Sequence, residues 1–340
     1  MGTSGTMEAT AKLRRKYLFL AVWAAASVFL GWQLRQPPYT FDTGRTVINF
    51  LVMLVCTIAL LSWIRNPISR ETAGKPAKKG LFALLILVSI IMLLLLPLKA
   101  VRAGLFLLPL IAVAILILLK EPIDKREILY ASILALLAGI AGLGAGWISW
   151  ITPATWGFLQ FLLVLTGLLA GWAILQHSGL RQEGVGTSHF LLHGTPSAFK
   201  AFGAGMLIAL PWAFLNVLSG GANQETWVKS WWQPVIAIQP GISEEAWARI
   251  LLVPLLYLLY RTTGQPRPAF TAALLVVAYW FAYMHTEGGA EGIPSAVIIG
   301  TLFSLPVSYL CFYRDLETAI GWHFAVDLIK FVFAFILFNK

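Results

Sequence analysis

The sequence has little charge and almost no cysteine. Only 12% of its 340 residues are charged, whereas 59% are hydrophobic, and this composition excludes an ordinary soluble globular domain. The two cysteines, Cys56 and Cys311, both lie inside apolar runs, where a thiol usually acts as a small hydrophobic group. The sequence therefore indicates neither a disulfide framework nor a cysteine metal cluster, and the lipid bilayer is expected to be part of the fold.

The hydrophobic residues fall into long runs. A helix needs about 20 mostly apolar residues to cross the hydrocarbon of a bilayer, which is about 30 Å thick. The sequence therefore predicts an all-α, polytopic transmembrane helical bundle with about 11 spans (9–12). The candidate spans are 17–34, 46–64, 80–98, 103–119, 128–151, 156–175, 201–218, 242–260, 269–284, 293–313 and 318–338.

The basic residues are distributed unevenly among the predicted loops. Short cytoplasmic loops are enriched in lysine and arginine, and most of the 25 lysines and arginines lie on the side that also carries the amino terminus. This indicates an integral protein of the plasma (inner) membrane with a cytoplasmic amino terminus. The formal net charge of +10 is then explained by contact with anionic lipid, and no nucleic-acid partner is indicated.

Regions with different chemistry follow each other along the chain. Residues 1–6 are interpreted as an artificial extension ahead of a second start at Met7. Residues 7–176 form an amino-terminal six-span membrane region of unassigned role, and 177–200 form a polar linker. In 201–340 the helices carry ionisable residues at hydrocarbon depth. Such groups cost a few kcal/mol each unless they are paired or hydrated, so an intramembrane site is expected in this last region.

Three other patterns favour structural roles. Four glycines (139, 142, 144 and 146) lie in an apolar helix with no preceding strand, which favours close helix packing over a phosphate loop. His189 and His193 lie in a polar segment with no obvious third ligand, which favours a solvated pair over a metal site. Three tryptophans around Lys229 are interpreted as an interfacial aromatic anchor: Trp227, Trp231 and Trp232.

The first chemically distinctive motif is Glu244-Glu245-x-x-x-Arg249, at the head of an apolar run. Glu245 and Arg249 are one helical turn apart and are expected to pair, while Glu244 points about 100° away and stays available. Ser243 or Gly241 is expected to begin this helix. Both carboxylates would then lie near its positive end.

Two further motifs lie on later apolar runs. Phe281-x-x-x-His285 ends one run, and His323-x-x-x-Asp327 lies inside the last one. His323, Asp327 and Lys330 follow i, i+4 and i+7 spacing and therefore share one helix face. Lys330 lies too deep to reach the interface, so we expect it to pair with Asp327.

Taken together, the three motifs resemble the signature motifs of the CPBP (CAAX protease and bacteriocin-processing, Abi) family of intramembrane endopeptidases, which includes the type II CAAX prenyl endopeptidases. The resemblance covers residues 242–338 and implies packed helices around a polar cavity. It also implies a glutamate-dependent mechanism in which Glu244 activates water and His285 helps to hold that water. His323 and Asp327 would stabilise the oxyanion.

The remaining motif residues are assigned supporting roles: Glu245, Arg249, Phe281 and Lys330. The family's third motif most often ends in asparagine, which carries an amide donor, whereas an ionised Asp327 can only accept. We expect Asp327 to bridge Lys330 and the ring of His323, orienting the ring and favouring its donor form.

The resemblance predicts no cofactor, although Glu244, His285 and His323 are acceptable zinc ligands and zinc is the alternative. The expected partners are a membrane-associated peptide or protein substrate and the bilayer. Amide hydrolysis needs a base and donors aimed at the oxyanion, and these residue types supply both. The alternative function is a non-catalytic membrane scaffold, or an ion- or partner-binding protein that retains the polar cluster.

Overall fold

The computed structural model describes residues 3–33, 43–64, 110–120, 123–144, 152–178, 180, 195–261, 266–286 and 291–338. Helices and turns make up this part of the chain, with no strand in it, and the predicted all-α class is confirmed. The helices are α1 (Thr3–Gln33), α2 (Thr43–Ile64), α5 (Lys125–Leu143), α6 (Pro153–His177), α7 (Thr195–Leu218), α8 (Ile238–Glu244), α9 (Val253–Tyr260), α10 (Pro266–Met284), α11 (Gly292–Ile299), α12 (Leu305–Tyr313) and α13 (Leu316–Phe338).

Six of the described helical segments are long and apolar enough to cross a membrane, so the polytopic bundle is confirmed. They are Lys125–Leu143, Pro153–Gln176, Pro196–Leu218, Pro266–Met284, Gly292–Tyr313 and Leu316–Phe338, with a shorter apolar helix at Val47–Trp63. Residues 17–33 of the predicted span 17–34 lie in α1, which is not among the six. The predicted span 80–98 lies outside the described residues, as do His189 and His193.

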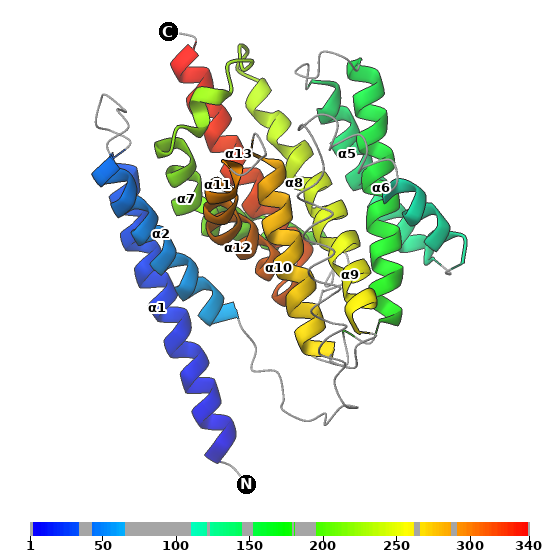
Figure 1. Ribbon diagram of the computed structural model, residues 1–340, viewed down its shortest axis with the longest axis horizontal. Helices are drawn as coiled ribbons and strands as arrows, with labels where there is room; N and C mark the ends of the chain where they lie inside the picture. Colours follow the sequence, from blue (N-terminus) through cyan, green and yellow to red (C-terminus); the bar gives the residue numbers. More distant parts are fainter. Residues whose placement is uncertain are drawn as a thin grey trace.

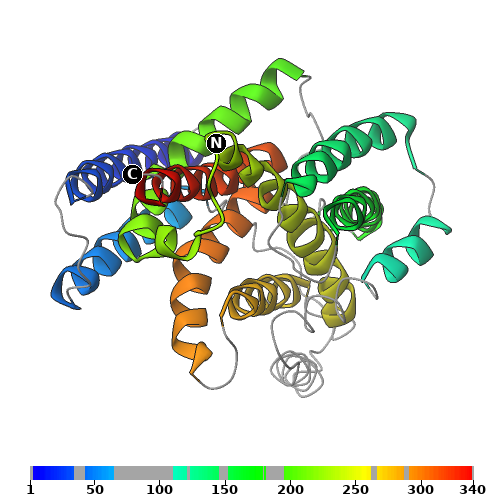
Figure 2. The ribbon, with the colours of Figure 1, turned by 90° about the horizontal axis from the view of Figure 1, so that it is seen from above.

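The helices of the last region lie in the middle of the bundle. In Figure 1, α1 and α2 lie side by side at one edge, α5 and α6 lie at the other, and α8 to α13 fill the space between them. The view from above keeps this order (Figure 2). Helix α13 packs along α7, and α6 packs against the middle of the run that begins with α8. The motif-bearing helices therefore lie between α1 and α2 on one side and α5 and α6 on the other.

Glycines allow the helices of this bundle to approach closely. A Cβ atom added to Gly139 would lie 3.1 Å from the carbonyl oxygen of Gly157. A Cβ atom added to Gly171 would lie 2.0 Å from the carbonyl oxygen of Ile250. The neighbouring backbone leaves no room for a side chain at Gly171, and at Gly139 it would have to shift by a few tenths of an ångström. The packing interpretation of the predicted glycine cluster is thus confirmed at Gly139, which lies on α5 against α6.

The helix that carries the two glutamates begins earlier than predicted. A 3₁₀ turn, η2 (Gln233–Ala237), leads into α8 at Ile238, and the helical run continues through a π-helical segment, η3 (Glu245–Leu252), into α9. The predicted start at Gly241 or Ser243 was therefore wrong. Glu244 lies six residues, about 9 Å, along the run and so not at its positive end.

A second π-helical segment, η5 (Gly300–Ser304), separates α11 from α12. Such segments are rare, and they often occur at functional sites because they redirect side chains within a helix. Here both segments contribute to one buried contact: Arg249 of η3 reaches Ser304 of η5. The irregular turns therefore lie where a buried charge needs polar partners.

The connection between α7 and α8 packs along the last half of α13. It contains η1 (Gly221–Gln224) and η2. Ala222, Val228 and Ala237 of this connection form a hydrophobic cluster with Phe331 and Ala334 of α13. The end of α13 therefore extends past the start of α8, alongside residues 219–237.

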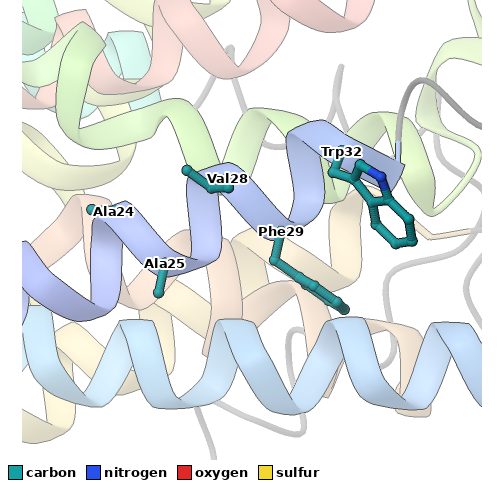
Figure 3. Close-up of a pocket in the computed structure, with 5 residues that line it drawn as sticks. All are labelled: Ala24, Ala25, Val28, Phe29 and Trp32. Carbon is teal, nitrogen blue, oxygen red and sulfur yellow. The ribbon is translucent and has the colours of Figure 1, made fainter.

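A shallow groove lies on α1, at the edge of the bundle. Figure 3 shows its lining, which consists of five apolar side chains of α1: Ala24, Ala25, Val28, Phe29 and Trp32. None of these side chains can titrate or act as a nucleophile. The groove therefore contributes nothing to a hydrolytic site.

Candidate active site

The carboxylate of Glu244 lies between two histidines that come from different helices. Its Oε1 is 3.8 Å from Nε2 of His285, and its Oε2 is 3.4 Å from Nε2 of His323. The three residues are far apart in sequence, and α8, α13 and the end of α10 bring them together. The predicted convergence of these side chains is confirmed.

The cluster is most exposed on the side of His285. The side chain of His285 is 43% exposed and that of Glu244 is 21% exposed, whereas His323 is 12% exposed. Glu244 Oε2 is buried and makes no hydrogen bond within the described residues. The site thus combines an exposed imidazole with a carboxylate oxygen that can still accept a hydrogen bond.

The backbone of α10 fixes the orientation of His285. Its Nδ1 lies 2.8 Å from the carbonyl oxygen of Phe281, one turn earlier. A carbonyl oxygen can only accept, so Nδ1 is the donor and Nε2 is left to face Glu244. The ring of Phe281 also packs against the imidazole, with 4.5 Å between ring centroids. The Phe-x-x-x-His motif is therefore one local unit that orients a histidine.

Glu245 is fully buried and contacts two other residues of the motifs. Its Oε1 is 3.4 Å from Nη1 of Arg249, which confirms the predicted pair, and 2.8 Å from Nδ1 of His323. The second contact was not predicted. It resembles the orienting carboxylate of hydrolytic sites, because a carboxylate on one ring nitrogen directs the other nitrogen toward the reacting groups.

Arg249 has polar partners on each side, although its side chain is fully buried. Its Nη2 donates to Ser304 Oγ at 2.9 Å, and its Nε donates to Ser308 Oγ at 3.3 Å. The guanidinium also lies 4.2 Å from the centre of the Phe281 ring. A buried charge is tolerated only with such compensation, and Arg249 thus links the glutamate motif to the phenylalanine of the second motif.

The third motif forms an ion-pair chain along α13. Asp327 Oδ2 is 3.5 Å from Nε2 of His323, and Asp327 Oδ1 is 3.1 Å from Nζ of Lys330. The predicted pairing of Lys330 with Asp327 is confirmed. Lys330 has a second partner that was not predicted, Glu225 of the α7–α8 connection, at 2.9 Å.

Some polar residues of the site carried too little signal to be identified from the sequence. Ser304 and Ser308 are spaced i, i+4 in an apolar span, and this repeat is the one trace of a shared polar face. A second buried chain runs beside the site: Gln239 Nε2 donates to Gln160 Oε1 at 2.9 Å and to Ser243 Oγ at 2.8 Å. It connects α6 to the helix turn that precedes Glu244.

The same side chains are of the types that bind metal ions. Both imidazoles direct Nε2 at Glu244 and use Nδ1 elsewhere, as many metal-binding histidines do. Among the described residues, however, no group of three or more histidine, cysteine, aspartate or glutamate side chains is arranged to hold a metal ion. If zinc is bound, Glu244, His285 and His323 are the residues that would hold it.

Comparison with known proteins identifies one family. Residues 226–329 match the family model described as type II CAAX prenyl endopeptidase Rce1-like, which confirms the resemblance seen in the three motifs. The match includes all three motifs and excludes the amino-terminal region. No curated protein and no solved structure matched the chain. The family comparison supports a protease at the level of the family.

Proposed function

We propose that this protein is a glutamate-dependent intramembrane endopeptidase that hydrolyses a peptide bond of a membrane-associated substrate. One observation carries the proposal: the Glu244 carboxylate lies within 3.8 Å of His285 Nε2 and 3.4 Å of His323 Nε2 in the middle of a helical bundle. Placing a carboxylate and two imidazoles inside an apolar helical bundle costs free energy, and ionisable groups in such places usually have a function.

Glu244 acts as the general base. The 3.8 Å between its Oε1 and His285 Nε2 is too long for a direct hydrogen bond, and we place the attacking water where both groups can reach it. As the water oxygen bonds to the scissile carbonyl carbon, its proton passes to Glu244 and the carbonyl π electrons move to the carbonyl oxygen. His285, the more exposed imidazole, holds the water in place.

His323 stabilises the oxyanion that results. Its Nδ1 donates to Glu245 and its Nε2 faces the site. In the doubly protonated ring Nε2 also carries a hydrogen, which is aimed at the developing charge. The C–N bond then breaks, and the proton taken up by Glu244 passes to the leaving amine. Asp327 orients the ring of His323 through the contact at Nε2. No step uses a metal, and zinc is the alternative to be tested.

The substrate class follows from the matched family. Its description names prenyl endopeptidases acting on CAAX sequences, so a peptide with a prenylated cysteine near its carboxyl terminus is the first substrate to test. We place the protein in the plasma (inner) membrane with a cytoplasmic amino terminus. The amino-terminal helices flank the helices that carry the site and are proposed to control access to it.

The test uses the full chain reconstituted in liposomes with a quenched fluorescent peptide ending in a farnesylated CAAX sequence. We expect cleavage by the wild type and none by Glu244→Gln, with the same melting temperature for both. The matched control is Glu127→Gln, because Glu127 on α5 accepts a hydrogen bond from Gln176 of α6 at 2.5 Å, away from the motifs. An active Glu244→Gln variant would remove the general-base assignment. A wild type that cleaves neither prenylated nor unprenylated peptides favours the non-catalytic scaffold.

A further inference from the structure

Glu225 is an acidic residue to which the mechanism gives no role. It lies directly after η1, in the connection between α7 and α8, and its side chain is only 17% exposed. Acidic residues of loops usually face water, and exposed ion pairs contribute little. This one is instead turned toward α13, where it contacts Lys330.

Lys330 lies between two carboxylates. Its Nζ is 2.9 Å from Glu225 Oε1 and 3.1 Å from Asp327 Oδ1, and its side chain is 17% exposed. The other oxygen of Asp327 lies 3.5 Å from His323 Nε2. Glu225, Lys330, Asp327 and His323 thus form one unbroken chain of contacts that begins outside the motifs and ends at the ring facing Glu244.

The carboxylate of Glu225 is held in place by its own segment. Its Oε2 accepts a hydrogen bond from Trp227 Nε1, at 2.5 Å. The Trp227 ring packs edge-on against Phe331 of α13, with 5.2 Å between centroids. Both oxygens of the carboxylate are therefore used, and Glu225 offers Lys330 a fixed rather than a mobile partner.

We propose that Glu225 is a positioning residue of the active site, which fixes Lys330 and, through it, Asp327 and the ring of His323. Lysine has a long flexible stem, and an ammonium with a single partner can turn about it. With Glu225 on its far side, Lys330 is confined to one place, and the carboxylate of Asp327 is confined with it. The inference rests on the proposed function, because it concerns the orientation of the proposed oxyanion donor.

The kinetic test compares Glu225→Ala, Glu225→Asp and the control Glu127→Gln in the reconstituted cleavage assay. Residues in one salt-bridge network are energetically coupled, so removing one changes the contribution of the others. We expect Glu225→Ala to lower kcat about tenfold, which is the size of effect that a coupling of this kind can have. KM should change less than twofold, and the melting temperature should match that of Glu127→Gln. Glu225→Asp should recover part of kcat, because the stem of Lys330 can reach the shorter side chain. An unchanged kcat in Glu225→Ala would overturn the proposal.

A double variant tests whether Glu225 acts through Lys330. Adding Glu225→Ala to Lys330→Met should lower kcat no further, because the chain is already interrupted. A further loss as large as that in the wild-type background would overturn the proposal, since Glu225 would then act by another route.

A spectroscopic test separates this inference from the proposed function. The protein holds five histidines, and with ¹⁵N-labelled histidine the ring signals of His323 are assigned by their loss in His323→Gln. We expect these signals to move in Glu225→Ala and to stay in place in Glu127→Gln. Unmoved His323 signals would overturn the inference whether or not the wild type cleaves the peptide. If the wild type cleaves no peptide but the His323 signals move in Glu225→Ala, the proposed function would be wrong and the positioning role of Glu225 would be supported.

Discussion

His323 Nδ1 lies 2.8 Å from Glu245 Oε1. This contact joins the last helix of the chain to the helix that carries the proposed base, and it leaves only Nε2 of the ring to face Glu244. Two adjacent glutamates therefore contact the same histidine from its two nitrogens. Their environments differ, because Glu245 is fully buried and Glu244 is 21% exposed. Adjacent residues of one type should thus respond differently to the same substitution.

The first prediction is that Glu245→Gln destabilises the protein, whereas Glu244→Gln does not. Glu245→Gln removes the charge that faces Arg249. Removing one partner of a buried ion pair lowers the free energy of unfolding by about 3–5 kcal/mol. We expect a clear fall in melting temperature in detergent, together with loss of cleavage because the His323 ring is no longer held. Equal melting temperatures for the two variants would show that breaking the buried Glu245–Arg249 pair does not destabilise the protein.

The second prediction concerns Arg249 and the π-helical segment η5. Ser304→Ala removes the 2.9 Å hydrogen bond from Nη2, and a hydrogen bond to a buried charge contributes about 1.5–3 kcal/mol. Unfolding experiments should show a loss of this size. The control is Ser219→Ala, because the hydroxyl of Ser219 is exposed and donates only to the carbonyl oxygen of Asn216. A Ser304→Ala variant as stable as the control would mean that water replaces the lost partner.

The sequence was sufficient to predict those parts of the site that depend on short spacing along one helix. The pairs Glu245–Arg249 and Asp327–Lys330 are separated by one turn, so helical periodicity alone brings them together. The convergence of Glu244 with the two histidines was also predictable, because ionisable groups at hydrocarbon depth need partners that lipid does not supply.

The depth of these residues was not predictable in the same way. The predicted spans 242–260 and 318–338 are the eighth and the eleventh and so cross the membrane in opposite directions. Glu244 and His323 each lie near the start of their span, so the predicted spans put them at different levels of the bundle. The structure removes the difference because α8 begins at Ile238 and because the end of α13 runs beside residues 219–237. Both features depend on tertiary packing of an irregular segment with weak periodicity, and the ion pair of Glu225 with Lys330 was missed for the same reason.

The third prediction is that catalysis needs no metal. A zinc site requires at least three protein ligands at about 2.0–2.2 Å from the ion, and among the described residues no group of three or more histidine, cysteine, aspartate or glutamate side chains is arranged to hold one. We expect the purified protein to hold substoichiometric zinc by mass spectrometry and to keep its activity after dialysis against a chelator. Activity that is lost with stoichiometric zinc and restored by its return would reverse this expectation.

The last prediction concerns Asp327, where the two contacts of the carboxylate have different consequences. Removing it does not leave Lys330 without a partner, because Glu225 stays 2.9 Å from Nζ. We therefore expect both Asp327→Asn and Asp327→Ala to fold with little change in melting temperature.

The two variants should differ in cleavage. The amide of Asp327→Asn can still contact His323 and can donate to an oxyanion, so this variant should retain appreciable activity. Asp327→Ala has no such group and should lose activity. The measurement is kcat for both variants in the liposome assay, beside the melting temperature of each. Wild-type cleavage by Asp327→Ala would show that residue 327 has no part in catalysis and that the third motif depends on His323 alone.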